Sequence, residues 1–412
     1  MNMDYLPNKK RIHSNSPLLP PFIPDEIIAE ILCVLPVKTI LQLKCVSKTW
    51  KTLITDPAFV QKHFNYSSLN PYLLFTPRKL RYPTSIVKFL HVLRFLETDS
   101  SNIVSNDSFR GGKDNCQVIG TCNGLICLFF HYCYRKYWFR LWNPATRILS
   151  KKLGIFEDHH TIYDSCKFTL GSDISTGTYK VVALSKVAVR EENAISIKNQ
   201  FGVLSLGDNC WRNFQFCSSI PVCLIYGNTE NINNGLHLNG TVNWLALPKY
   251  IQPFYQYDCK SIANAQQFVI VSLDLSTETC TQFLLPPGFD EVPLFQPTLN
   301  ILMGCLCFLH DLKGSEFVIW HMKEFGVQKS WTMLFKITHN DIQMDDYLSQ
   351  FSTYYVPLYL SKNGDTCILA NYDDNHLFIY NQREKRVRRT RIANKLGWFS
   401  PMEYVESLVS TC

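Results

Sequence analysis

The side chains best suited to chemistry in this sequence are sixteen cysteines and eleven histidines. Zinc sites need such ligands at short spacings, as in C-x-x-C or H-x-x-x-H. The closest approaches are Cys122 with Cys127 and Cys305 with Cys307, and both pairs alternate with Leu, Ile and Phe as strand positions do. The sequence therefore predicts buried free thiols, with no metal site and no cofactor.

Motifs of enzyme catalysis do not stand out either. The chain has no G-x-S-x-G elbow, no known catalytic cysteine signature, no P-loop and no G-x-G-x-x-G. His159 and His160 are adjacent, so on a strand they would point to opposite faces, and an exposed loop is the favoured interpretation. We predict a non-catalytic protein and assign no catalytic residue.

A strongly basic segment lies near the C-terminus. Its six cations are Arg383, Lys385, Arg386, Arg388, Arg389 and Arg391. On a strand, Arg386 and Arg388 would share one face and the other cations would point away, which favours a solvated edge strand over a docking patch for acidic groups. Nucleic-acid binding is not expected, because only Tyr380 supplies an aromatic ring nearby.

Length and composition limit the class of protein. The 412 residues are 46% hydrophobic and 18% charged, enough for a substantial core in two or more units. No apolar run reaches the roughly 18 residues of a membrane span, and the polar start of the chain is unlike a secretory signal. We therefore expect no membrane contact, a location in the cytoplasm or nucleus, and thiols rather than disulfides. The net charge of +7 is modest.

Residues 20–68 are predicted to form short helices, after a disordered leader at 1–19. Apolar residues from Ile27 to Leu35 follow the spacing of one helix face, and Pro36 ends that helix. Two further short periodic stretches follow, and Asp56-Pro57 predicts the start of a fourth helix. A unit this small cannot hide all its apolar side chains, so part of the stripe should contact another protein.

The string IPDEIIAEILCVLPVKTILQLKCVSKTWKTLI resembles the F-box, a helical module that attaches to a Skp-type adaptor and, through it, to a cullin. The resemblance implies a docking face made of Pro24, Ile27, Ile31, Leu32, Leu35, Pro36, Val37, Leu41 and Lys44. It assigns Val46, Trp50 and Leu53 to the core of the module.

Residues 69–412 alternate with the period of strands. Asn-Gly pairs at Asn123, Asn239 and Asn363 indicate type I′ hairpins. A second kind of turn, in which Asn or Asp is followed by Thr or Gly, is visible in five copies, such as LWNPATRIL. Two hairpins per unit make four strands, which predicts an antiparallel β-propeller of about six blades. The sixth blade would join PYLLF and IVKFLHVL to the C-terminal SPMEYVESLV, and an irregular two-sheet sandwich is the alternative.

This β segment resembles the F-box-associated interaction domain of plant proteins named F-box/kelch-repeat. The likeness lies in VIGTCNGLICL, LWNPATR, YKVVALS, LNGTVNWLA and VESLVS, whereas a kelch-type glycine pair occurs only at Gly111-Gly112. The overall expectation is an α+β multidomain chain with a small N-terminal helical F-box and a mainly antiparallel all-β domain.

The resemblance implies a non-catalytic substrate receptor of an SCF-type ubiquitin ligase. Its target protein and its target-binding residues are unknown, and loops near 155–165, 207–211, 228–235 and 250–265 are the expected contacts. A ligand-binding propeller, or a Skp-bound scaffold outside a ligase, remains open as an alternative.

Overall fold

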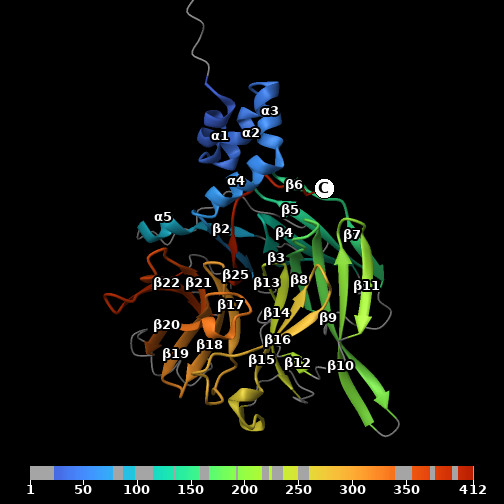
Figure 1. Ribbon diagram of the computed structural model, residues 1–412, viewed down its shortest axis with the longest axis vertical. Coiled ribbons are helices and arrows are strands. Elements are labelled where there is room, and N and C mark those ends of the chain that lie inside the picture. The colour runs from blue at the N-terminus through green and yellow to red at the C-terminus, as the bar shows by residue number, and fades with distance from the viewer. Residues whose placement is uncertain are drawn as a thin grey trace, which may run out of the picture.

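The computed structural model describes a helical module seated on one side of a ring of β-sheets (Figure 1). The described residues are 23–77, 87–97, 115–132, 136–157, 167–191, 194–215, 222–224, 235–248, 259–338, 355–371, 376–391 and 398–411. The predicted leader at 1–19, the histidine pair at 159–160 and the expected loop at 228–234 lie outside them. Across the described part of the chain, the helices fall short of what a bilayer crossing requires.

Four helices form the module: α1 (Asp25–Cys33), α2 (Val37–Leu43), α3 (Lys48–Thr55) and α4 (Pro57–Ser67). Side chains cap two of them. The Ser47 hydroxyl accepts a hydrogen bond from the Trp50 amide at the start of α3. The Asp56 carboxylate accepts from two amides of α4, with Pro57 in the first helical position as predicted. These caps fix where short helices begin, although their own propensity is marginal.

Six antiparallel sheets make the ring. Blade 1 holds β1 (Tyr72–Pro77), β2 (Lys88–His91) and β25 (Trp398–Tyr404); blade 2 holds β3 (Asn115–Cys122), β4 (Leu125–Tyr132), β5 (Lys136–Asn143), β6 (Ile148–Leu149) and β7 (Leu153–Glu157); blade 3 holds β8 (Lys167–Ser172), β9 (Tyr179–Glu191), β10 (Ala194–Ser205) and β11 (Cys210–Gln215). Blade 4 holds β12 (Val222–Leu224), β13 (Leu236–Leu238), β14 (Thr241–Pro248), β15 (Val269–Asp274) and β16 (Cys280–Leu284); blade 5 holds β17 (Thr298–Leu302), β18 (Cys305–Leu312), β19 (Glu316–Met322) and β20 (Trp331–Thr338); blade 6 holds β21 (Tyr355–Leu360), β22 (Thr366–Asn371), β23 (His376–Asn381) and β24 (Arg386–Arg391). One short helix, α5 (Val92–Glu97), follows β2.

The two ends of the chain close the ring in blade 1. The C-terminal strand β25 pairs with β1, with Tyr72 opposite Tyr404 and Leu73 opposite Glu403. The innermost strands then contact one another in the order β25, β3, β8, β13, β17, β21 and back to β25. The six-bladed propeller and its closure are therefore confirmed, and the two-sheet sandwich is wrong. Blade 1 differs in having three described strands, whereas the other blades have four or five.

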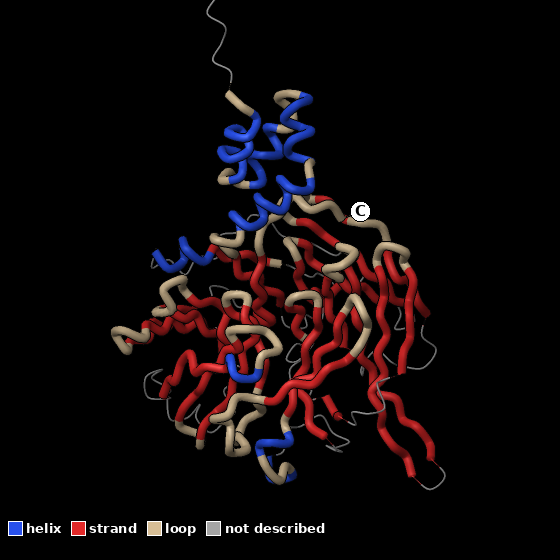
Figure 2. Tube along the Cα trace, viewed as in Figure 1, coloured by secondary structure: helices blue, strands red, loops and turns tan. Residues whose placement is uncertain are grey.

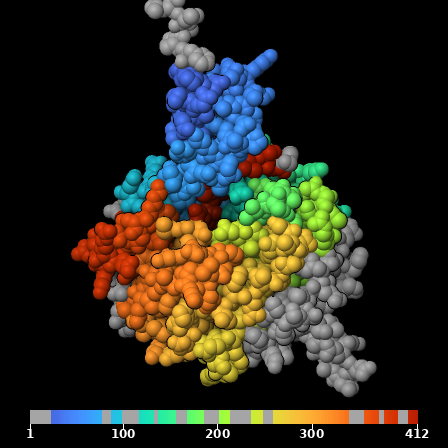
Figure 3. Space-filling view, viewed as in Figure 1, coloured from blue at the N-terminus to red at the C-terminus, as the bar shows by residue number. Residues whose placement is uncertain are grey.

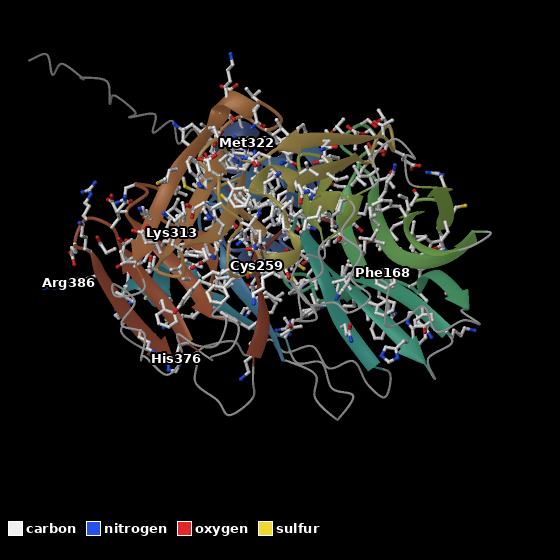
Figure 4. The ribbon with its side chains drawn as sticks, turned by 90° about the horizontal axis from the view of Figure 1, so that it is seen from below. Phe168, Cys259, Lys313, Met322, His376 and Arg386 are labelled. Atoms are coloured by element: carbon white, nitrogen blue, oxygen red, sulfur yellow. The ribbon has the colours of Figure 1, made fainter. Side chains whose placement is uncertain are left out.

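Apolar clusters hold the blades together, one at each of the six boundaries. Viewed from below, the sheets surround a common centre (Figure 4). Phe201 and Trp244, for example, pack against each other between blades 3 and 4, with their ring centroids 5.3 Å apart and their planes tilted by 52°. Because each blade is covered by a neighbour on both faces, most strands bury side chains on both of their faces. This explains why the strands contain long apolar runs.

The turns explain the repeated Asn and Asp residues. In four of the described blades, the side-chain oxygen of Asn143, Asp173, Asp274 or Asn381 accepts hydrogen bonds from the amides two and three residues later. The residue four positions on then has a positive φ, as with Arg147 and Gly177. This Asx-turn geometry is favoured by Asn and Asp because their short side chains reach the following amides.

Two of the three Asn-Gly pairs form the predicted type I′ turn. Asn123 and Asn239, with the glycines after them, all have positive φ. At the third pair only Gly364 does, so the prediction for Asn363 is wrong. There the Asn363 side chain accepts a hydrogen bond from the Ser361 hydroxyl, 2.6 Å away, inside a wider loop.

The C-terminal segment after β25 lies between the ring and the helical module. Leu408 joins the core of the module, and Ala145 packs against it. The buried Asn143 amide donates to the carbonyls of Ser407, 3.0 Å away, and Val409, 2.8 Å away. Figure 3 shows this dark red segment directly below the blue module. One side chain therefore connects blade 2 to the segment on which the module rests.

We expect Asn143→Asp to destabilise the protein by about 3 kcal/mol, because a buried carboxylate would face two carbonyl oxygens. The turn itself should survive, since an aspartate occupies the same position at Asp274. Urea denaturation of the full chain measures the change in the free energy of unfolding.

Asn381→Asp is the matched control. Asn381 makes the same turn, and its side-chain oxygen accepts from Arg383 and Glu384. Its substitution should change the free energy of unfolding by less than about 0.5 kcal/mol. Equal losses in the two variants would show that the bonds to the C-terminal segment contribute nothing.

Candidate functional site

A stripe of exposed apolar side chains runs along one face of α1 and its end. Ile27, Ile31 and Val34 are spaced by four and three residues, so they lie on the same side of the helix. All three are exposed, Ile31 by 54%, and Pro24 extends the stripe toward the N-terminus. Large aliphatic side chains are costly to leave in water, and in a row on one helix they mark a protein-binding surface. We call these four residues the α1 stripe.

The opposite side of α1 faces the core of the module. This core consists of Leu32, Cys33, Val37, Ile40, Ile54, Phe59 and Leu408. Figure 2 shows how the four helices pack together above the ring. The module thus buries one set of apolar residues and presents a second.

The structure divides the predicted docking residues into three groups. Pro24, Ile27, Ile31 and Pro36 are exposed, whereas Leu35, Leu41 and Lys44 are half-buried. Leu32 is 2% exposed and Val37 is fully buried, so neither is available on the surface of the module. Their assignment to the docking face is therefore wrong, because both side chains belong to the core of the module. The run Ile31-Leu32-Cys33 is apolar on two faces, and hydrophobicity alone did not indicate which face points inward.

The predicted core of the module also changes. Trp50 and Leu53 are half-buried and pack against the core. Val46, in contrast, is 64% exposed in the turn between α2 and α3. The prediction for Val46 is wrong because its amide bonds to the Leu43 carbonyl, which places it in the turn before α3 begins. Val34 and Val46 were missed as surface residues. The spacing from Ile27 and Ile31 could have identified Val34.

Charge differs between the helices of the module. Asp25 and Glu26 lie in the first turn of α1, where the helix dipole favours them. Lys38, Lys44, Lys48 and Lys51 lie on α2 and α3 or just beside them. Burial, with a smaller effect of Lys51, lowers the pKa of the Lys44 ammonium. An exposed ion pair joins Lys62 of α4 to Glu30 of α1.

A buried histidine fixes α4 against the end of α1. The Nε2 atom of His63 is 2.9 Å from the carbonyl of Leu35, and its Nδ1 atom is 3.4 Å from the hydroxyl of Ser67. With Nε2–H donating to Leu35, Nδ1 is free to accept from Ser67. Burial lowers the pKa of His63, so the ring is neutral near pH 7.

A second polar cluster lies where the innermost strands of blades 2, 3 and 4 meet. The Sγ atom of Cys122 is 3.6 Å from Nδ1 of His237, and the Ser172 amide donates to Nε2 of the same ring over 3.1 Å. Burial raises the pKa of Cys122 to about 11. A nucleophilic thiol requires a lowered pKa, so this cluster links three strands without an activated sulfur. The described residues contain no cluster of three or more side chains suited to a metal ion.

The expected contact loop at 207–211 takes part in packing between blades. The Asn209 side chain accepts from the Gly154 amide, and the Trp211 indole donates to the Gly154 carbonyl. Asp208 pairs with Arg212 over 2.9 Å. The other expected loops are described only at 155–157, Gly235 and 259–265, and the target-binding residues stay unassigned.

Comparison with known families fits both parts of the structure. Residues 22–62 match the F-box domain, and residues 83–411 match the F-box associated beta propeller domain. The chain belongs to this family of F-box proteins. The second match covers most of the ring, including the closing strand β25, and begins after β1.

Curated relatives from Arabidopsis thaliana are named as F-box proteins. F-box/kelch-repeat protein At3g23880 is 30% identical over 334 residues, covering 76% of this chain and 79% of its own. F-box protein CPR1 is 25% identical over 399 residues, covering 95% of this chain and 89% of its own. A chain of the solved nidogen/laminin complex aligns with a TM-score of 0.42 at 8% identity, over 82% of this chain and 99% of its own.

Truncation of adjacent α1 residues should separate surface from core. Leu32→Ala should destabilise the module by about 3 kcal/mol, because it removes a buried side chain and leaves a cavity. Ile31→Ala should change its stability by less than about 0.5 kcal/mol, because that side chain is exposed. Hydrogen exchange of peptides from α1 to α4 reports the stability of the module separately from that of the ring. Comparable losses of protection would contradict the division.

Proposed function

We propose that this F-box protein is the substrate-recognition subunit of an SCF-type ubiquitin ligase. Its α1 stripe and neighbouring residues would dock to a Skp-type adaptor, and through it to a cullin. The propeller would hold the target protein. The observation that carries the proposal is the exposed α1 stripe on a helix whose other face is buried, in a module that matches the F-box domain.

The placement of the module supports this division of roles. Leu408 and Ala145 of the propeller pack at the core of the module and connect it to the ring. The helices α1, α2 and α3 stand away from the ring, and α4 lies next to it (Figure 1). An adaptor seated on the α1 stripe would therefore leave the propeller available to a target.

The mechanism proposed for this chain is proximity. Holding a target lysine close to an activated thioester on another subunit raises its effective concentration, and no group of this chain needs to attack or to transfer a proton. The raised pKa of Cys122 agrees with a role that requires no nucleophile here. The two buried hydrogen bonds of Asn143 to the C-terminal segment support such a role, because a loosely joined propeller would spread the target over many positions.

The docking proposal is tested by Ile31→Asp in the full chain. A carboxylate in the middle of a desolvated contact should weaken adaptor binding by about 2 kcal/mol or more. Pull-down from plant extract, probed for the Skp-type adaptor and the cullin, should recover both with the natural chain and neither with the variant. Thermal unfolding should be unchanged, because Ile31 is exposed.

Ile155→Asp is the control, because it places the same charge at an exposed isoleucine on β7 of the propeller. It should leave adaptor recovery intact. Undiminished recovery with Ile31→Asp would remove the α1 stripe from the docking surface. Recovery of adaptor without cullin by the natural chain would instead favour a scaffold outside a ligase.

A further inference from the structure

The basic segment from Arg383 to Arg391 forms the turn and the outer strand of the last hairpin of blade 6. Within the described residues its strand, β24, pairs only with β23, so it is the edge of the sheet. Arg386 lies at the periphery of the ring, far from its centre (Figure 4). The edge-strand prediction is therefore confirmed. An edge strand offers a row of backbone donors and acceptors to an added strand.

The charge on this edge exceeds what protection against aggregation requires. Six cations and one anion give the segment a net charge of +5, whereas the whole chain carries +7. One or two charges are enough to discourage pairing between edges. Side chains two apart on a strand, such as Arg386 and Arg388, are separated by roughly 7 Å, which is within the screening length in physiological salt. Like charges at this spacing repel one another, and an acidic segment alongside would relieve that repulsion.

Several cations already have partners inside the hairpin. Arg383 pairs with Asp365 over 2.8 Å, and the Arg389 guanidinium lies 5.7 Å from the centre of the Phe378 ring. Val387 points to the opposite face from Arg386 and Arg388, and packs against the cluster between blades 5 and 6. Lys385 and Arg386 are exposed and make no ion pair with a described residue. The strand is thus fixed by its inner face and presents charge outward.

We propose that β24 is a docking edge for an extended acidic segment of a partner protein, which adds as a further antiparallel or parallel strand. In such a pairing, acidic side chains at every second position of the added strand would lie beside Arg386 and Arg388. Backbone hydrogen bonds supply affinity, and charge selects the segment. This surface lies on the propeller, and the proposal does not depend on the α1 stripe.

Two observations favour a peptide over other anions. The nearby aromatic rings of Phe378 and Tyr380 are buried, so they offer no stacking surface to nucleic-acid bases. None of the exposed large hydrophobic residues lies between His376 and Arg391, whereas membrane-binding surfaces combine cations with exposed apolar side chains. An edge strand with cations at successive positions of one face, as with Arg386 and Arg388, fits an extended polypeptide best.

The test is fluorescence anisotropy with the full chain and a labelled peptide that alternates glutamate and valine. The peptide should bind, and its affinity should fall as salt rises. Arg386→Glu combined with Arg388→Glu should weaken binding at least about tenfold, because two attractive contacts become repulsive. Lys323→Glu with Lys329→Glu is the matched control, since both lysines are exposed in blade 5, and it should bind as the natural chain does.

Strand addition is tested separately from charge. Two peptides of the same sequence, N-methylated on alternate residues in the two possible registers, remove one row of amide donors each. At least one of them should bind at least about tenfold more weakly, because its backbone can no longer pair with the edge. Three results would each overturn the proposal: both methylated peptides binding as tightly as the unmethylated one, equal effects of the two charge-reversed variants, or tighter binding of oligothymidylate or anionic vesicles. Adaptor recovery should be unaffected in every variant, which keeps this test independent of the docking proposal.

Discussion

Closure of the ring by its two ends is the constraint on which the rest of the structure depends. The strand β25 is the innermost strand of blade 1, but its neighbour β1 lies more than three hundred residues earlier in the chain. Until the two pair, blades 2 and 6 each lack the partner that covers one of their faces. The segment that follows β25 then accepts two hydrogen bonds from Asn143, and its Leu408 packs in the core of the module. Closure of the ring and attachment of the module are thus consecutive parts of the same C-terminal segment.

The helical module is limited by its size. Its core has seven buried residues, one of which, Leu408, comes from the propeller. The module therefore does not complete its own core, and it does not cover the α1 stripe. Packing of Leu408 in this core fixes one side of the module to the ring, and the α1 stripe stays exposed for contact with another protein. Both features follow from the same shortage of volume in a short chain.

The sequence predicted the architecture better than it predicted which face of each helix points toward the core. Turn chemistry is local, so the Asx turns at Asn143 and Asp274 and the turns at Asn123 and Asn239 could be recognised from a few residues. The orientation of Leu32, Val37 and Val46 depends on which neighbour covers each helix, and that is a tertiary property. The prediction of a type I′ turn at Asn363 was wrong for a related reason, because the hydroxyl of nearby Ser361 donates a hydrogen bond to the Asn363 side chain. The role of Asn143 in holding the C-terminal segment has no local signal at all.

The geometry of the turns also determines which side of the ring faces the module. In an antiparallel blade, the turn after the first strand and the turn after the third lie on the same side. The module packs near the second of these turns in blade 2, at Ala145. The short 3₁₀ segments from Cys259 to Gln267 connect the second and third strands of blade 4, so they lie at the opposite end (Figure 2).

Strands of eight residues separate the two sides by about 25 Å. A target held on the far side would stand at that distance from the module, so a small tilt at the junction would move it by several ångströms. Two hydrogen bonds from a fully buried Asn143 limit that tilt, which gives the proposed receptor a physical reason to hold its C-terminal segment inside its own structure.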